Sequence, residues 1–339
     1  MKQTIIHTPF HSSKILIGEK LSNLTGYLPD TRVIIITDEK VNSIYGKQFP
    51  QVPVIVIGRG EKNKTMATLD QIFDKLVEYE ADRSTFIVAI GGGIVCDVVG
   101  LAASIYMRGL RYGFVSTTLL SQVDASVGGK NGVNFRGYKN MIGVFNQPEF
   151  VLCDTGMLLS LDDFEYISGF AEIIKAAAIK SETLFEFLEK NYEAALNKDM
   201  NVLEHVIAES VQIKADVVEQ DEKEKGERKK LNFGHTFAHS IEHNTGILHG
   251  EAVSLGMVLA ADLSEDLGLL SRDHHDRLVR LLKNMKLPVE QNIDYPALIS
   301  AMKKDKKRRG ESIDMVLIDR IGNAVIKPIT IKQLEEKYL

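Results

Sequence analysis

Between residue 30 and about residue 155, short runs of β-branched and apolar residues alternate with segments of helical periodicity. This alternation is typical of a parallel sheet whose strands are joined by helices. We expect strands at residues 33–37, 54–57, 86–90 and 112–116. Residues 65–81 repeat apolar side chains at the spacing of one buried helix face and predict a crossover helix. The first part of the chain is therefore predicted to be an α/β domain.

Strand patterns nearly vanish after Asp162 and Asp163, which are suited to cap a helix, and helical patterns continue to about residue 305. A length of 339 residues leaves room for two domains. We expect an α/β domain at residues 1–158 and a mostly α-helical domain at residues 159–339. Within the latter, residues 315–318 and 325–326 predict a small hairpin around Gly322 and Asn323.

Composition limits the partners and the compartment. The chain carries 41 Lys and Arg against 46 Asp and Glu, a net charge of −5, so it has no general attraction for nucleic acid or for an anionic membrane. Any anionic ligand must be captured by local cations. Two cysteines, Cys96 and Cys153, are too few for a disulfide framework and fit a reducing compartment. The first residues lack the apolar core of a signal peptide, and we expect a cytoplasmic protein.

One apolar segment and two charged segments each have to be interpreted before the motifs are considered. The apolar stretch 87–107 is interrupted by Gly91–Gly93, so a buried strand and helix fit it better than a membrane span. The charged residues 219–230 are interpreted as a mobile surface loop. The basic residues 303–309 are interpreted as a solvated helix end; a nucleic-acid patch is the alternative, but no aromatic residues interleave with them.

The glycines that follow the strand at 86–90 suggest a nucleotide site. Residues without side chains let the backbone approach a pyrophosphate, and the free N–H groups of the next helix attract its charge. The pattern is not GxGxxG, and a tight turn required for packing is the alternative. Asp97, within the apolar helix, favours a ligand because a buried carboxylate needs a partner.

A second turn-rich segment, residues 117–132, places hydroxyls, an acid, an amide and a lysine directly after a predicted strand, where α/β folds bind ligands. Lys139 and Asn140 follow soon after. An irregular surface loop is the alternative interpretation, although the length of this segment favours a function.

Four of the nine histidines lie between residues 235 and 249. His235, His239 and His243 repeat every four residues, and so does an apolar set beginning at Phe233. An offset of two residues is about 200° of helix rotation, so the two stripes lie on opposite faces. We expect the apolar stripe to pack in the core and the imidazoles to face a polar cleft.

Histidines at i and i+4 can ligate one divalent metal, but no glutamate stands between them as in HExxH, which disfavours a metalloprotease. A third ligand could be His249 or a carboxylate such as Glu172, which shares a helix face with Lys175. The alternatives are a structural Glu172–Lys175 ion pair and hydrogen-bonded core histidines. Spacing alone leaves open which groups bind metal.

In their order, these motifs resemble the 3-dehydroquinate synthase family, and the likeness extends from Asp38 to Lys307. The segments that carry it are 91–97, 106–109, 117–120, 123–130, 139–143, 169–175, 232–239 and 249–253. The resemblance implies a Rossmann-like NAD-binding domain, a helical metal- and substrate-binding domain, and an active site in the cleft between them. It also implies NAD and a divalent metal, with Zn²⁺ expected and Co²⁺ as the other candidate.

The resemblance assigns roles to individual residues. It implies that Glu172, His235 and His249 ligate the metal. The residues implied to bind NAD are Asp38, Glu61, Lys64, Gly92, Gly93, Asp97, Thr117, Thr118, Lys130 and Lys139. Those implied to bind substrate are Arg108, Asp124, Lys139, Asn140, Lys214, Arg228, Lys306 and Lys307. Catalytic roles fall to Lys130, Lys175, Asn232 and His239. Arg108 is expected to reach a neighbouring subunit's site, which implies a homodimer.

The family converts 3-deoxy-D-arabino-heptulosonate 7-phosphate to 3-dehydroquinate and phosphate, in the shikimate pathway of aromatic amino acid biosynthesis. The reaction combines transient oxidation by NAD, phosphate elimination, re-reduction and intramolecular aldol closure, so it is a lyase reaction overall. Residues 134–138 differ from the proline-containing link usual in the family, and a different substrate preference would arise there. The alternatives are another sugar phosphate cyclase, such as 2-deoxy-scyllo-inosose synthase, a metal-dependent polyol or glycerol-1-phosphate dehydrogenase, and a catalytically silent binding protein.

Overall fold

The computed structural model of the chain describes residues 1–9, 11–303, 308–309 and 311–339. They form two compact units, one of residues 1–161 with 203–223 and one of residues 162–202 with 224–339. The predicted division into 1–158 and 159–339 misses that residues 203–223, in helix α6 (Met200–Gln220) and just after it, belong to the first unit. Polar contacts explain this: Lys214 Nζ lies 2.5 Å from Asp124 Oδ1, and Thr4 Oγ1 donates to Gln212 Oε1 at 3.2 Å.

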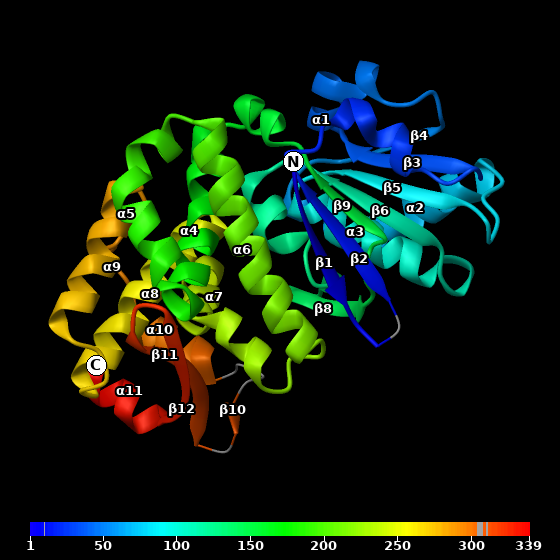
Figure 1. Cartoon of the computed structure of the whole chain (residues 1–339). Coiled ribbons are helices and arrows are strands. Elements are labelled where there is room, and N and C mark those ends of the chain that lie inside the picture. The colour runs from blue at the N-terminus through cyan, green and yellow to red at the C-terminus, as the bar shows by residue number, and fades with distance from the viewer. Residues whose placement is uncertain (10, 304–307, 310) are drawn as a thin grey trace. The chain divides into compact units, whose positions relative to one another are not determined.

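The first unit is built on a seven-stranded sheet in the order β1-β2-β9-β6-β5-β3-β4 (Figure 1). β1 is antiparallel to β2, and the remaining neighbours pair in parallel. In that order the strands are β1 (Lys2–His7), β2 (Ser12–Ile17), β9 (Phe150–Cys153), β6 (Arg111–Ser116), β5 (Phe86–Gly91), β3 (Val33–Asp38) and β4 (Val54–Ile57). The central strands are continuous apolar runs because both faces of a parallel sheet are buried. All four predicted strands are present, whereas β1, β2 and β9 were not predicted.

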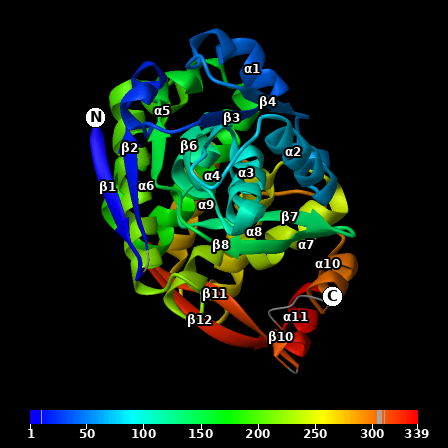
Figure 2. The same ribbon diagram turned by 90° about the vertical axis from the view of Figure 1, so that its right-hand side faces the viewer.

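Three helices of this unit follow strands of the sheet: α1 (Glu39–Tyr45), α2 (Met66–Glu78) and α3 (Gly93–Ile105). Thr65 caps α2 by accepting from Thr68 N, and the helix ends three residues before the predicted end. A hairpin of β7 (Lys130–Phe135) and β8 (Tyr138–Phe145) packs against α3 (Figure 2). The segment 117–132, which the sequence left open as a possible irregular loop, includes only the first three residues of this hairpin.

The second unit is mostly helical, as predicted. Its helices are α4 (Asp163–Lys180), α5 (Glu182–Leu196), α7 (His235–Thr245), α8 (His249–Asp266), α9 (Arg272–Asn284), α10 (Tyr295–Lys303) and α11 (Ile331–Tyr338). A small antiparallel sheet contains β10 (Arg308–Arg309), β11 (Ser312–Arg320) and β12 (Asn323–Thr330). The predicted hairpin is present and longer than expected, with Leu317 opposite Val325.

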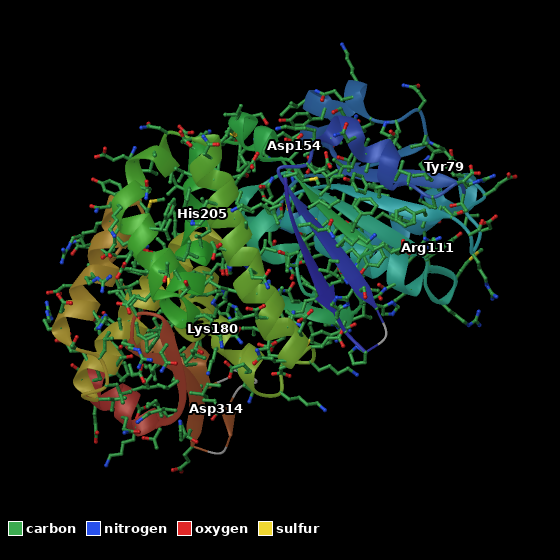
Figure 3. The ribbon with its side chains drawn as sticks, viewed as in Figure 1. Tyr79, Arg111, Asp154, Lys180, His205 and Asp314 are labelled. Atoms are coloured by element: carbon green, nitrogen blue, oxygen red, sulfur yellow. The ribbon has the colours of Figure 1, made fainter. Side chains whose placement is uncertain are left out.

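The charged residues 219–230 are not one mobile loop. Their first residues end α6, and Glu227–Asn232 form a 3₁₀ turn whose Arg228 is 1% exposed. Ion pairs anchor this turn: Lys180 Nζ lies 3.5 Å from Glu227 Oε1, and Lys229 Nζ lies 3.6 Å from Asp314 Oδ2 (Figure 3 labels Lys180 and Asp314). The expectation failed because a run of charges does not reveal which members have buried partners.

In the basic cluster 303–309, α10 ends at Lys303 and β10 begins at Arg308, while residues 304–307 lie outside the described residues. The substrate residues expected at 306 and 307 therefore have no structural description. Among the described helices, none combines the length and the apolar character needed to cross a membrane.

Candidate active site

Three helices of the second unit bring one carboxylate and two imidazoles together. Glu172 lies on α4, His235 begins α7 and His249 begins α8. Glu172 Oε1 lies 3.2 Å from His249 Nε2 and 3.5 Å from His235 Nε2, and one ligand atom from each residue lies within 4.8 Å of the others. Two nitrogens and one oxygen at this spacing are the donor set of a catalytic zinc site with an open fourth position.

Close helix packing creates this spacing. A Cβ on Gly250 would lie 1.9 Å from the carbonyl oxygen of Ser168 on α4. A Cβ on Gly256 would lie 2.1 Å from the carbonyl oxygen of Gly234, the residue before α7. Only glycine allows α8 to approach both neighbours this closely. Gly250 N also donates to Ser168 Oγ at 3.0 Å, which fixes the first turn of α8 against α4.

The second nitrogen of each imidazole faces its own acceptor. His235 Nδ1 lies 3.2 Å from the carbonyl oxygen of Phe233, and His249 Nδ1 lies 3.7 Å from Glu242 Oε2. When the imidazole is neutral, an acceptor at Nδ1 keeps the ring proton there, so that the Nε2 lone pair faces the metal, the usual arrangement of metal-ligating histidines. The residues present therefore fit a divalent metal on the Glu172 side of both rings.

The charges of the cluster are strongly coupled. Burial opposes ionisation of Glu172, but Lys175 and the two histidines outweigh it and hold its pKa well below the usual range. Burial, reinforced by Lys175, lowers the pKa of His235 well below its usual value. Burial acts in the same direction on His249, yet its contacts with Glu172 and Glu242 prevail and raise its pKa to about 9. Lys175 is 3% exposed and forms an ion pair with Glu172 Oε2.

The histidine stripe is only partly as expected. Phe233, Phe237 and Ile241 are buried as predicted, but His235 is buried too, whereas His239 is exposed. The rings of His235 and His239 are 5.6 Å apart, and His239 is not part of the ligand cluster. The i and i+4 pair therefore does not supply both nitrogens.

In the first unit, the sheet has a switch point between β3 and β5. From β3 the chain moves outward to β4, and from β5 it moves the other way to β6. Open α/β sheets bind ligands beyond the carboxyl ends of the strands at such a point. Asp38 ends β3 and accepts from Val41 N at 2.9 Å, while Gly92 and Gly93 follow β5 at the start of α3.

The two glycines lie in tight surroundings. A Cβ on Gly92 would lie 2.9 Å from Thr118 Cγ2, and one on Gly93 would lie 2.9 Å from the Cβ of Ala125. Thr117 N donates to the Gly91 carbonyl at 3.0 Å. The glycines thus bring the ends of β5 and β6 together and leave backbone N–H groups of α3 available to an anionic ligand.

Lys64 and Asp97 form an ion pair beside these glycines, with 2.5 Å between Nζ and Oδ2. Lys64 is buried, and burial raises the pKa of Asp97 despite the lysine. Glu61 precedes Lys64 in a short 3₁₀ turn, Glu61–Asn63. The sequence predicted a ligand as the partner of the Asp97 carboxylate. In the structure its partner is Lys64, a lysine of the same unit.

The remaining predicted residues are distributed over both units. In the first unit, Lys214 donates to Asp124. Lys130, Lys139 and Asn140 are exposed on the β7–β8 hairpin, and Arg108 is exposed after α3. In the second unit, Asn232 Nδ2 donates to Glu224 Oε1, and Arg228 is buried.

Glu242 was not singled out from the sequence, although its position seven residues after His235 places it on the same helix face two turns away.

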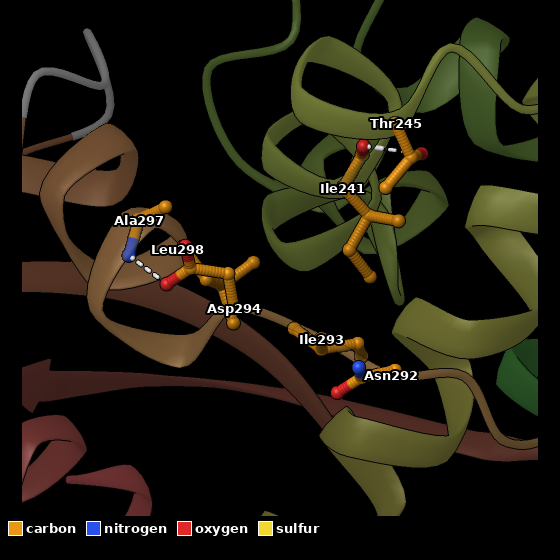
Figure 4. A pocket seen from close by; sticks show the side chains of 7 residues that line it. All are labelled: Ile241, Thr245, Asn292, Ile293, Asp294, Ala297 and Leu298. Carbon is orange, nitrogen blue, oxygen red and sulfur yellow. Dashed lines mark hydrogen bonds between the residues drawn. The ribbon is translucent and has the colours of Figure 1, made fainter.

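A pocket of about 170 Å³ in the second unit has none of these groups in its lining (Figure 4). It is lined by Ile241, Thr245, Asn292, Ile293, Asp294, Ala297 and Leu298. Ile241 belongs to the apolar stripe of α7, opposite the histidines. The ligand cluster has the donor chemistry of a metal site and this pocket has not, so we place the site at the cluster.

Fold and site together define the class of the sugar phosphate cyclases. The chain superposes on 2-epi-5-epi-valiolone synthase from Streptomyces hygroscopicus with NAD⁺ and Zn²⁺ bound, with a TM-score of 0.89, 29% identity, and 99% and 98% of the two chains covered. For 2-deoxy-scyllo-inosose synthase complexed with carbaglucose-6-phosphate, NAD⁺ and Co²⁺, the TM-score is 0.88 at 26% identity, with 99% and 98% covered. A probable glycerol dehydrogenase from Sinorhizobium meliloti, 14% identical with a TM-score of 0.66 and 95% and 93% covered, shares the fold alone.

Residues 54–168 match the family model "3-dehydroquinate synthase N-terminal", and residues 169–308 match "3-dehydroquinate synthase C-terminal". A 3-dehydroquinate synthase from Halorhodospira halophila is 42% identical over an alignment of 330 residues, and the match covers 93% of this chain and 92% of the relative. The chain belongs to the 3-dehydroquinate synthase family.

Proposed function

We propose that the chain converts 3-deoxy-D-arabino-heptulosonate 7-phosphate to 3-dehydroquinate and phosphate, with NAD and a divalent metal, Zn²⁺ or Co²⁺. The observation that carries the proposal is the buried Glu172–His235–His249 cluster in a chain that matches a 3-dehydroquinate synthase over nearly its whole length. When bound, NAD accepts and returns a hydride, and the metal acts as a Lewis acid.

The chain's own residues hold the metal and the charges of the substrate. Glu172, His235 and His249 are the ligands in this proposal, and Lys175 neutralises the glutamate in the buried surroundings. His239, exposed beside His235, exchanges a proton with a substrate oxygen. Asn232, held by Glu224, orients a hydroxyl.

The cations capture the anionic substrate. Phosphate and carboxylate binding is proposed for the cations Lys130, Lys139, Lys214, Arg228 and, from a neighbouring copy, Arg108, together with the neutral amide of Asn140. Arginine forks and lysine ammonium groups suit these anions, which explains how a chain of net charge −5 takes a multiply charged ligand. A homodimer in the cytoplasm is part of the proposal.

NAD binding is proposed at the ends of β3 and β5. Asp38 suits ribose hydroxyls, and the α3 N-terminus with Gly92 and Gly93 suits the pyrophosphate. The other residues proposed to bind NAD are Glu61, Lys64, Asp97, Thr117 and Thr118.

Phosphate release tests the proposal. The zinc-loaded protein is mixed with the heptulosonate phosphate and with other sugar phosphates, with and without a chelator. We expect release from the heptulosonate alone, abolished by chelation, with no accumulation of NADH. Stoichiometric NADH formation with glycerol 1-phosphate would instead identify a dehydrogenase, and release only from another sugar phosphate would identify a different cyclase.

A further inference from the structure

Asn134 lies where the ladder of the β7–β8 hairpin is interrupted. Pairing is regular as far as Val133, which lies opposite Ile142. It then shifts, so that Phe135 lies opposite Tyr138. One residue of β7 therefore faces three residues of β8. A bulge of this kind bends the strand and redirects its side chains, and bulges are frequent next to active sites.

The bulge carries two residues of the proposed substrate site. Lys139 and Asn140 fall within it, and Asn140 has a left-handed backbone with φ of 50°. The Asn140 N–H donates to Asn134 Oδ1 at 2.9 Å. The side chain of Asn134 thus supplies the acceptor that the interrupted ladder lacks, and it holds Asn140 in a conformation that a non-glycine residue adopts only with support.

The same asparagine also binds the segment that carries two proposed NAD residues. Asn134 Nδ2 donates to Glu61 Oε1 at 2.7 Å, and Asn134 N donates to the Lys64 carbonyl at 2.8 Å. Lys64 in turn pairs with Asp97 at the start of α3. Glu61 is 73 residues from Asn134 in the chain, so this bond joins segments that local structure does not hold together.

We propose that Asn134 is a positioning residue that sets the cofactor segment and the substrate bulge in register with each other. Its single amide accepts at one end and donates at the other, so a shift of Glu61 moves the acceptor of Asn140. NAD binding and substrate binding therefore favour each other, and a change at Asn134 weakens both. This inference rests on the proposed function for the identity of the two ligands.

The test compares two variants of the full-length, zinc-loaded protein. Asn134→Ala removes both side-chain bonds. We expect it to raise the Kd of NAD, measured by calorimetry without substrate, about tenfold and to raise the KM for the heptulosonate phosphate about tenfold. Asn134→Asp keeps the acceptor for Asn140 but places a carboxylate against Glu61. It is expected to weaken NAD binding as much, with a smaller change in KM.

A rescue distinguishes positioning from general loosening. Adding Glu61→Gln to Asn134→Asp provides an amide that donates to the new carboxylate, and we expect NAD to bind more tightly than to Asn134→Asp alone. The matched control is Asn63→Ala, which removes a hydrogen bond within the same segment, donated by Asn63 Nδ2 to the Arg59 carbonyl at 2.7 Å. It is expected to leave KM unchanged.

Unchanged NAD affinity in Asn134→Ala, an equal rise of KM in the Asn63→Ala control, or no rescue in the double variant would each overturn the inference. If the unmodified protein releases no phosphate, the proposed function fails. The NAD titrations still decide on Asn134, because they need no substrate.

Discussion

Gly250→Ala tests whether helix packing sets the geometry of the metal site. The added methyl would lie 1.9 Å from the Ser168 carbonyl oxygen, and contacts below 3.0 Å do not occur at a real Cβ. The start of α8 must therefore withdraw from α4 by about 1 Å, because close-packed helices cannot absorb the overlap otherwise. His249 is the preceding residue and moves with it, away from Glu172.

The expected loss follows from the tolerance of metal coordination. Ligand distances are held to within about 0.2 Å, so a displacement of about 1 Å disturbs the site and should weaken zinc binding by about 10- to 100-fold. Overpacking should also cost about 1–3 kcal/mol of stability. Alanine favours a helix more than glycine does, so helix propensity cannot cause either loss.

Competition with a chromogenic chelator measures the zinc affinity, and thermal unfolding followed by circular dichroism measures the stability. Gly26→Ala is the control, because a Cβ there meets no atom within 4 Å. If Gly250→Ala binds zinc as tightly as the unmodified protein and unfolds at the same temperature, the packing argument is wrong.

Further predictions concern both units. Glu172→Gln should abolish zinc retention in metal analysis, whereas His239→Ala should keep zinc and slow phosphate release about 10²- to 10⁴-fold; equal zinc loss in both would refute the choice of ligands. In the metal-free protein, burial lowers the pKa of His249 but its two carboxylate contacts raise it to about 9, and zinc takes only neutral imidazole. Zinc binding near neutral pH should thus release a proton, and the zinc affinity should increase with pH up to about pH 9. Calorimetry in buffers of different ionisation enthalpy measures the proton release, and binding without it would contradict this prediction. Lys64→Met should weaken NAD binding about tenfold in the same titration, because Asp97 loses its cation, and unchanged affinity would exclude this role.

Local periodicity predicted the elements whose pattern is complete within one segment. The buried strands β3 and β5, the amphipathic helix α2 and the apolar stripe of α7 are of this kind. β1 was missed because it exposes alternate residues at the sheet edge and pairs only with β2, which itself joins the sheet through β9, more than a hundred residues away.

The site was less accessible to such reasoning. Glu172, His235 and His249 lie on three helices, and no spacing rule connects the first with the others; the family resemblance supplied the set. Glu242 went unnoticed, and Asn134 was noticed only as part of the unusual link 134–138, because the significance of both depends on partners that only the folded chain brings near. The charged run 219–230 misled for the same reason, since Arg228 is buried by its tertiary surroundings.

The central claim is that a hydride leaves the substrate and returns to it within one turnover. The most direct measurement uses heptulosonate phosphate deuterated at the carbon that is oxidised, with the zinc-loaded protein and an excess of unlabelled NAD, and mass spectrometry of the product. We predict that the deuterium is retained at that carbon while the NAD pool stays unlabelled and oxidised. Deuterium lost from the product and found in accumulated NADH would contradict the account.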